Sequence, residues 1–138
     1  MSGDVAAVVV TYNSASEVDN CLRSLENVAE IVVVDNGSQD DTCRVVGQHR
    51  KGVRFIANPE NRGFAGAANQ GVRATVSPLV LFLNPDAALL DGVQPLVEQL
   101  KGPGVGAVAG RLVNGAGETQ IGFNVRAFPT PEIGRAHV

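Results

Sequence analysis

An apolar run in this sequence ends abruptly in a turn that carries one carboxylate. Residues Leu79–Leu83 of "SPLVLFLNPDAALLDG" contain no charge, so we predict a strand that is buried on both faces. Asn84, Pro85 and Asp86 follow, and the strand should stop here because proline cannot donate to a sheet ladder. A carboxylate on this stiff turn could hold Mg²⁺ or Mn²⁺ together with phosphate oxygens and water. The simpler alternative is that Asp86 only caps or solvates a loop, since these are common turn residues.

Polar side chains follow three other predicted strands in the same way. These strands are expected over Val5–Tyr12, Glu30–Asp35 and Val53–Asn58. Open parallel sheets bind ligands outside the carboxyl ends of their strands, so we expect these side chains to lie together. Besides Asn84 and Asp86, the residues at these ends are Thr11, Tyr12, Asn13, Asp35, Asn36, Gly37, Asn58, Glu60, Asn61 and Arg62.

The chemistry of this set suggests a nucleotide ligand. Tyr12 offers a flat face for a base. Asp35 only accepts hydrogen bonds, which suits an N–H of a uracil or thymine ring or a ribose hydroxyl. Alternatively, Asp35 caps a helix that begins at Ser38. Arg62 is permanently charged and could reach a diphosphate or a base carbonyl, although a solvated loop charge is the alternative.

Two common phosphate-binding motifs are absent from the sequence. A dinucleotide fold needs G-x-G-x-x-G in its first turn, but that turn is "TYNSAS" here and has no glycine. A Walker A loop is also absent, and "GFAGAANQG" follows the third predicted strand. The phosphate charge would therefore be neutralised in another way, and a cation held by Asp86 would do so.

The elements that must position these residues alternate between short β-branched strands and longer helical segments. Helices are predicted from Ser14, which is spaced from Glu17 as in a capping box, from Ser38, over "GFAGAANQGVRATV", and after Asp91. The alanine-rich segment should pack closely against the sheet. A fifth strand, "VGAVAGRLV", and an "NGAG" turn follow. This order predicts a three-layer α/β/α fold with a mostly parallel sheet and right-handed crossovers.

Composition narrows the class of protein. The chain has 138 residues, 44% hydrophobic and 18% charged residues and a net charge of -3, which describes one soluble globular domain and argues against nucleic acid as a partner. No apolar segment approaches the ~20 residues of a membrane span, and the first residues do not form a secretory signal. Cys21 and Cys43 lack metal or redox spacing and are predicted to be small buried residues in a reducing compartment.

The sequence divides into a predicted domain and a short tail at its carboxyl end. We assign residues 1–131 to a nucleotide-sugar-binding part of a larger domain. The last seven residues, "EIGRAHV", can be encoded by a common sequencing-adapter oligonucleotide, so residues 132–138 are interpreted as a non-native tail.

Four segments in this order and spacing resemble family 2 glycosyltransferases with the GT-A fold. They are "VVVTYNSASEVDNCLRSL", "VVVDNGSQDDT", "NRGFAGAANQG" and "LFLNPDA". The resemblance covers Val5–Val113, and "LNPDA" followed by "AVAGRLVNGAGETQ" is similar to the bacterial rhamnosyltransferase-like branch that builds cell-surface polysaccharide. It implies a cytoplasmic enzyme, in peripheral contact with the inner face of a membrane. The donor would be a UDP- or dTDP-sugar, with dTDP-rhamnose the best candidate, and the acceptor a saccharide or polyprenyl-linked saccharide.

The resemblance also implies residue roles. Thr11 and Tyr12 would line the base pocket, Asp35 would bind the pyrimidine ring, and Arg62 would lie near the base or diphosphate. Asp86 would match the final acid of the D-x-D metal motif and bind Mg²⁺ or Mn²⁺. The sequence departs from that motif because its first acid is replaced in "NPD", which removes the carboxylate that normally contacts the ribose.

The implied reaction is an inverting transfer in which a base takes a proton from the attacking acceptor hydroxyl. The resemblance places this general base beyond residue 138, so we predict little or no turnover by these residues. Two other classes stay open from the residues alone: a noncatalytic nucleotide-binding α/β module and an oxidoreductase with an irregular dinucleotide fold.

Overall fold

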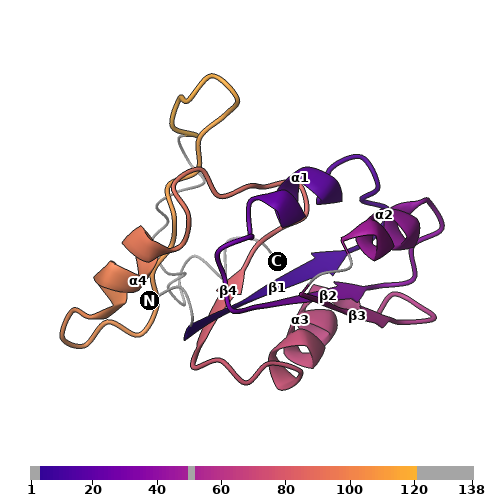
Figure 1. The fold of residues 1–138 in the computed structure, drawn as a ribbon, viewed down its shortest axis with the longest axis horizontal. Coiled ribbons are helices and arrows are strands. Elements are labelled where there is room, and N and C mark those ends of the chain that lie inside the picture. Colours follow the sequence, from indigo (N-terminus) through magenta and orange to yellow (C-terminus); the bar gives the residue numbers. More distant parts are fainter. Residues whose placement is uncertain (1–3, 50–51, 121–138) are drawn as a thin grey trace, which may run out of the picture. The chain divides into compact units, whose positions relative to one another are not determined.

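The computed structural model describes residues 4–49 and 52–120. The chain divides after Val97 into two compact units. The first unit contains nearly all the regular structure (Figure 1). Its elements are β1 (Val5–Thr11), α1 (Val18–Arg23), β2 (Glu30–Asp35), α2 (Thr42–Gln48), β3 (Val53–Ala57), α3 (Gly63–Arg73), β4 (Leu79–Phe82) and the start of α4 (Gln94–Leu100).

The four strands form one parallel sheet in the order β3-β2-β1-β4. Thr11 pairs with Asp35, and Asp35 pairs with Ala57, so the carboxyl ends of β1, β2 and β3 are level. Val8 pairs with Phe82, and the Leu83 amide donates to the Val8 carbonyl at 3.2 Å. The carboxyl ends of all four strands therefore meet at one edge, as the sequence predicts.

Helices cover both faces of the sheet, α1 and α2 on one side and α3 on the other (Figure 1). Side chains alternate along β1: Ala7 and Val9 pack with the core under α1 and α2, while Val8 packs with the core under α3. A strand covered on both faces is expected to be apolar throughout, which explains the continuous run in β1. The predicted three-layer α/β/α class is confirmed.

Small residues let α3 approach the sheet closely. Ala67 is fully buried, and an alanine Cβ at Gly71 would lie only 2.5 Å from Val8 Cγ1 and 3.3 Å from Val34 Cγ2. Real Cβ atoms do not approach carbon atoms at 2.5 Å, so this position requires glycine unless the packing shifts. The predicted close packing of the alanine-rich segment is confirmed.

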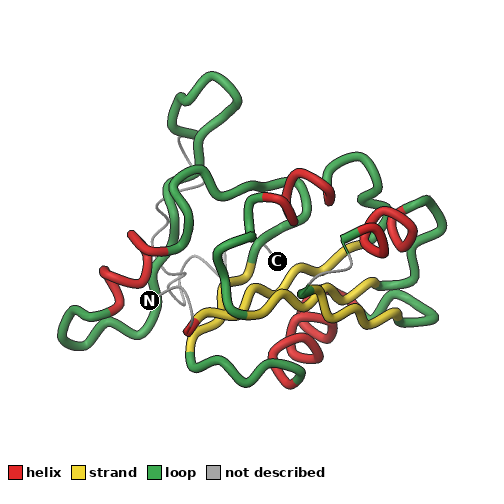
Figure 2. The backbone as a smooth tube through the Cα atoms, in the orientation of Figure 1, coloured by secondary structure: helices red, strands yellow, loops and turns green. Residues whose placement is uncertain are grey.

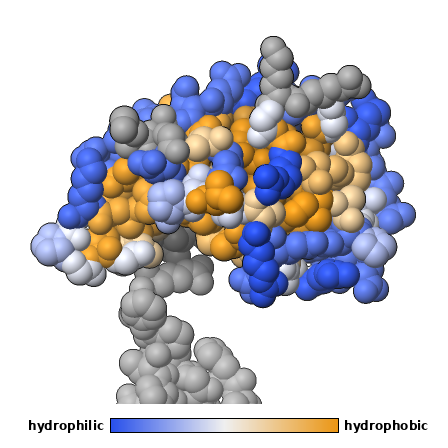
Figure 3. Space-filling view, turned by 60° about the horizontal axis from the view of Figure 1, so that its bottom comes forward, coloured by the Kyte–Doolittle hydropathy of each residue, from blue (hydrophilic) through white to orange (hydrophobic). Residues whose placement is uncertain are grey.

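The prediction that Leu79–Leu83 is buried on both faces is wrong. Every residue of β4 is at least partly exposed, and 52% of Phe82 is accessible to solvent. The reason is position, since β4 is an edge strand of the described sheet, and α3 packs mainly against β1 and β2. Phe82 of this strand is therefore one of the large hydrophobic side chains at the surface of the protein. Figure 3 shows hydrophobic areas on one face of the molecule.

Two helices begin later than the sequence predicts. Helix α1 begins at Val18 without a side-chain cap, and the Ser14 hydroxyl contacts the backbone of Tyr12, so the capping box does not form. Helix α2 begins at Thr42 instead of Ser38. Ser38 is outside the helix because its amide and hydroxyl both donate to the Asp35 carboxylate.

The second unit, from Glu98, is mostly irregular where it is described (Figure 2). The predicted fifth strand over residues 105–113 does not form, and only Val113 pairs, antiparallel, with Thr119. The predicted turn is present: the Asn114 amide donates to the Glu118 carbonyl at 2.9 Å. The predicted non-native tail, residues 132–138, lies outside the described residues.

Candidate functional site

Asp35, at the carboxyl end of β2, is the most densely bonded side chain of the predicted site. Only 1% of the residue is exposed. One carboxylate oxygen accepts from the Thr11 hydroxyl at 2.7 Å and the Ser38 hydroxyl at 2.6 Å, and the other from the amides of Gly37 (3.1 Å) and Ser38 (2.9 Å). Burial raises the pKa of Asp35, but these hydrogen bonds outweigh it and hold the pKa below its ordinary value. A nucleobase would have to replace one of these donors to reach Asp35.

Asn36 connects the sheet to the start of α3. Only 2% of the residue is exposed. Its Nδ2 donates to the Gly63 carbonyl at 3.1 Å, and its Oδ1 accepts from Asn58 Nδ2 at 3.2 Å and the Arg62 amide at 3.4 Å. Asn58 also donates to Gln70 Oε1 in α3, at 2.9 Å. These contacts fix the segment that carries Arg62 against the ends of β2 and β3.

The loop after β1 presents Tyr12 to solvent. The ring is among the exposed large side chains, at 51%. The next residue, Asn13, has a φ of 50°, a left-handed conformation that is uncommon outside glycine but tolerated by asparagine. Its amide donates to the Ser38 hydroxyl at 2.8 Å, and its Oδ1 accepts from the Gln39 amide at 2.8 Å. The predicted ligand residue Asn13 thus joins the loops after β1 and β2.

Two further hydrogen bonds hold the same pair of loops together. The Ser14 amide donates to the Thr42 hydroxyl at 2.8 Å, and the Ala15 amide donates to Asp40 Oδ2 at 3.1 Å. Asp40 Oδ1 in turn accepts from the Thr42 amide and hydroxyl. Ser38, Asp40 and Thr42 were not predicted as site residues, although the run of short polar residues in "NGSQDDT" is typical of a segment that bonds to neighbouring backbone.

Arg62 immediately precedes α3 and is exposed. Within residues 4–49 and 52–120 its guanidinium has no ion pair or hydrogen-bond partner. Nearby, Gly37 has a φ of 80°, and a Cβ at that position would lie 3.1 Å from the backbone of Glu60. The loops after β2 and β3 are therefore in close contact, which brings the Arg62 segment toward the strand ends.

The turn after β4 packs against α1. The Ala87 amide donates to the Asn84 carbonyl at 3.1 Å, and the buried Cys21 thiol donates to the same oxygen at 3.5 Å. Burial, followed by the negative charge of Asp86, raises the pKa of Cys21 to about 12. Asp86 belongs to this turn, which follows the strand next to β1.

The environment of Asp86 is compatible with a cation. Asp86 is exposed, and its carboxylate makes no ion pair or hydrogen bond to any residue that the structure describes. The same residues contain no group of three potential metal-ligating side chains among His, Cys, Asp and Glu. A cation here would take one protein carboxylate and complete its shell with ligand and water oxygens, as Mg²⁺ commonly does.

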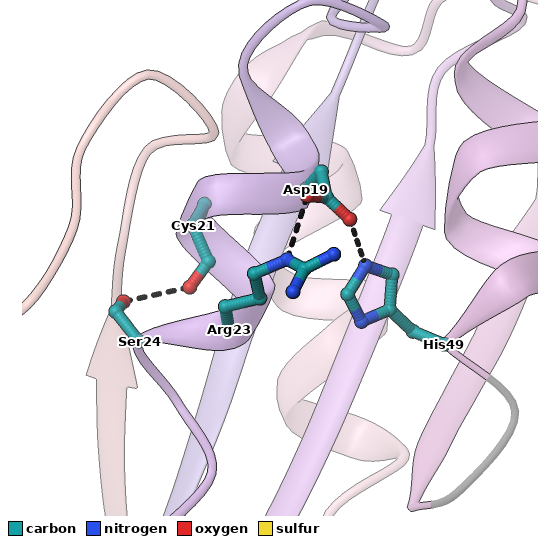
Figure 4. Close-up of polar contacts among 5 residues, drawn as sticks. All are labelled: Asp19, Cys21, Arg23, Ser24 and His49. Carbon is teal, nitrogen blue, oxygen red and sulfur yellow. Dashed lines mark hydrogen bonds and ion pairs between the residues drawn. The ribbon is translucent and has the colours of Figure 1, made fainter.

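A second polar cluster lies outside this edge. Asp19 of α1 contacts Arg23 Nε and His49 Nε2, each at 2.7 Å (Figure 4). The hydrogen bonds from Arg23 and then from His49 lower the pKa of Asp19. The cluster borders a cavity of about 500 Å³ that Ile31 and Val53, at the amino ends of β2 and β3, also line. It ties α1 to the end of α2, away from the predicted site.

Two smaller predictions can be compared with the structure. Cys21 is buried as predicted, but Cys43, in the first turn of α2, is exposed. Among residues 4–49 and 52–120, no helix is long and apolar enough to cross a membrane.

Comparison with known proteins places this arrangement in a family. Residues 6–135 match the family described as Glycosyl transferase family 2. The low-salt glycan biosynthesis hexosyltransferase Agl10 of Haloferax volcanii is 29% identical over 137 residues, which are 96% of this chain and 42% of that protein. The lipopolysaccharide core biosynthesis glycosyltransferase LpsC of Rhizobium meliloti is 29% identical over 70% of this chain and 36% of its own length. The chain thus spans less than half of these relatives.

Solved structures agree with this placement. The mannosyltransferase PcManGT from Pyrobaculum calidifontis, in complex with GDP-Man and Mn²⁺, has a TM-score of 0.65 at 25% identity, over 72% of this chain and 33% of that one. TarS 1-349 from S. aureus has a TM-score of 0.61 at 25% identity, over 71% and 31%. The fold is therefore of the GT-A type, and the chain belongs to glycosyl transferase family 2.

Proposed function

We propose that this chain binds the nucleoside-diphosphate part of a sugar donor at the carboxyl edge of its sheet. One observation carries the proposal: Tyr12, Arg62 and Asp86 are exposed at this edge, while a buried network holds the loops around them. Neither Arg62 nor Asp86 has a charged partner within the described residues. The Tyr12 ring suits a base, the unpaired Arg62 guanidinium suits a diphosphate, and the unpaired Asp86 carboxylate suits a metal ion bound to that diphosphate.

The exposed residues and the buried residues would have different roles. Tyr12 would stack on the base, and Arg62 would pair with the diphosphate. The buried side chains of Thr11 and Asp35 would chiefly position the Tyr12 loop, and Asn36 would position the Arg62 segment. Asn13 would act in the same way, through its contact with Gln39. Direct contact of these four residues, and of Asn84, with the nucleotide stays a prediction.

Asp86 would hold a divalent cation, Mg²⁺ or Mn²⁺, in agreement with the Mn²⁺ of the PcManGT complex. When bound, such an ion stabilises the negative charge of a leaving diphosphate, an effect of several kcal/mol. The tight turn from Asn84 to Ala87 and the contact with Cys21 would fix the direction of the carboxylate.

The proposal extends from donor binding to the reaction that the complete protein would catalyse. We infer an inverting hexosyl transfer from a UDP-, dTDP- or GDP-sugar, with dTDP-rhamnose as one candidate, to a saccharide or polyprenyl-linked acceptor at the inner face of a membrane. Synthesis of a cell-surface polysaccharide would be the setting, as the name of LpsC indicates for that relative. The general base would lie outside these residues, so we expect little or no turnover from the 138-residue chain.

A noncatalytic nucleotide-binding module would use the same edge without needing a cation. Titration calorimetry with UDP, dTDP, GDP and NAD, each with and without Mn²⁺, distinguishes a metal-dependent donor site from such a module. We expect at least one nucleoside diphosphate to bind, with an affinity that depends on Mn²⁺ and falls about tenfold or more in Asp86→Asn.

The matched control is Asp91→Asn, which removes the same charge from another exposed loop residue and should change nothing. Binding of a diphosphate that ignores both Mn²⁺ and Asp86→Asn would support the noncatalytic alternative. Absence of any diphosphate binding would refute the proposed function.

A further inference from the structure

We propose that Ser38 is a positioning residue for the donor site and that it acts through Tyr12. The inference rests on the proposed function, because Tyr12 is there the face on which the base stacks. Ser38 belongs to the loop after β2, whereas Tyr12 belongs to the loop after β1. The hydroxyl of Ser38 is one of the atoms that join the two loops, and it is the one bonded both to the sheet and to the residue after Tyr12.

The Ser38 hydroxyl is anchored on one side by the sheet. It donates to Asp35 Oδ1 at 2.6 Å, and Thr11 donates to the same oxygen at 2.7 Å. Thr11 and Asp35 are register partners on adjacent strands, and both are buried. The Ser38 hydroxyl is therefore fixed by the ends of β1 and β2, although Ser38 itself lies in a loop.

On its other side the hydroxyl holds the backbone of the Tyr12 loop. It accepts from the Asn13 amide at 2.8 Å, and the neighbouring Gln39 amide donates to Asn13 Oδ1 at 2.8 Å. Together these bonds hold Asn13 in its left-handed conformation, at a φ of 50°. Tyr12 lies between the strand residue Thr11 and this held residue, so the direction of its ring depends on Ser38.

The two hydrogen bonds of the Ser38 hydroxyl suit a positioning role. Its proton is directed to Asp35, and its oxygen accepts from the Asn13 amide. Without it, the Asn13 amide loses its acceptor and Tyr12 can leave the conformation that stacks on a base. Ligand would then bind only the fraction of molecules in which Tyr12 keeps that conformation. The observed affinity falls in proportion to this fraction.

The sequence itself offers a specific probe of this effect. Tyr12 is the only tyrosine of the chain, and there is no tryptophan. Intrinsic tyrosine fluorescence thus reports on Tyr12 alone, and its anisotropy in the free protein measures how firmly the ring is held. This readout needs neither turnover nor a bound ligand.

The experiment compares Ser38→Ala, Ser38→Thr and the control Ser77→Ala. Ser77 makes an equivalent bond, from its hydroxyl to Glu30 Oε1 at 2.6 Å, but at the amino end of β2. Each variant is measured for tyrosine anisotropy, thermal stability and the dissociation constant of the diphosphate that wild type binds with Mn²⁺. We expect Ser38→Ala to weaken binding about tenfold, equal to about 1.4 kcal/mol, and to lower the anisotropy. Ser38→Thr, which keeps the hydroxyl, should restore both values.

Ser77→Ala should lose stability but keep both the affinity and the anisotropy of wild type. The inference is overturned if Ser38→Ala binds as wild type does, or if Ser77→Ala weakens binding equally, since the effect would then be one of general stability. If wild type binds no diphosphate, the proposed function itself fails and the positioning role fails with it. The two failures are therefore distinguishable by the behaviour of the wild-type chain.

Discussion

Gly71 lies in α3 against Val8 and Val34, and its replacement by alanine should destabilise the fold despite alanine's higher helix propensity. The added Cβ would lie 2.5 Å from Val8 Cγ1 and 3.3 Å from Val34 Cγ2. Overpacking of this kind typically costs 1–3 kcal/mol, and alanine regains about 0.5–1 kcal/mol relative to glycine within a helix. We expect Gly71→Ala to lower the free energy of unfolding by about 1–2 kcal/mol, or the Tm by about 3–10 °C.

A matched control is available in α2. Gly47 is also within a helix, but a Cβ there would have no atom within 4 Å. Gly47→Ala should therefore show the propensity gain alone and stabilise the fold by about 0.5–1 kcal/mol. Urea unfolding followed by circular dichroism measures both variants, and the two should shift in opposite directions.

The result also bears on the site. Gln70, next to Gly71, bonds to Asn58 at 2.9 Å, and Gly63 at the start of α3 accepts from Asn36. If α3 moves outward to admit the methyl group, these contacts lengthen, and nucleotide binding should weaken along with stability. A Gly71→Ala variant as stable as Gly47→Ala would refute the close approach of α3 that the whole edge depends on.

Two further predictions concern titratable groups. In the native chain Ellman's reagent should modify the exposed Cys43 faster than the buried Cys21. The pKa of both thiols is raised, that of Cys21 to about 12, so the difference in accessibility should decide the order, and denaturant should make the second thiol reactive. Two native thiols that react at similar rates would contradict the packing of α1. Because hydrogen bonds hold the pKa of Asp35 below its ordinary value, its carboxylate stabilises the fold above about pH 4, and this contribution is lost as the pH falls through the folded-state pKa. Urea unfolding should therefore show that the free energy of unfolding changes less between pH 7 and pH 3 in Asp35→Asn than in wild type. An equal change in both proteins would contradict a stabilising role of the hydrogen-bonded carboxylate.

The sequence was sufficient to predict most of the fold because its apolar runs are short, β-branched and regularly separated by helical segments. The same regularity placed Thr11, Asp35 and Asn58 correctly at strand ends. The burial of Leu79–Leu83 and the strand over residues 105–113 were wrong because composition shows that a segment is apolar, but not which neighbours cover it. An edge strand and a central strand can have the same amino-acid composition.

The roles within the site were harder to predict from local patterns. The Ser38 hydroxyl bonds to Asn13, which is 25 residues away, and a capping rule considers only the next few residues. The spacing of Ser14 and Glu17 fits a capping box, yet the Ser14 amide bonds to Thr42, 28 residues later. Tertiary partners of this kind override local capping preferences, and they turn predicted ligand residues into residues that hold loops.

Paramagnetic broadening by Mn²⁺ in the amide spectrum of the chain would locate the proposed cation directly. With a nucleoside diphosphate present, the amides of Tyr12, Gly37 and Ala87, which follow the carboxyl ends of β1, β2 and β4, should broaden. Those of Ala29 and Ser77, at the amino ends of the strands, should stay sharp, and Asp86→Asn should abolish the effect. Broadening centred on Ala29 and Ser77, or broadening that survives Asp86→Asn, would contradict a donor site at this edge.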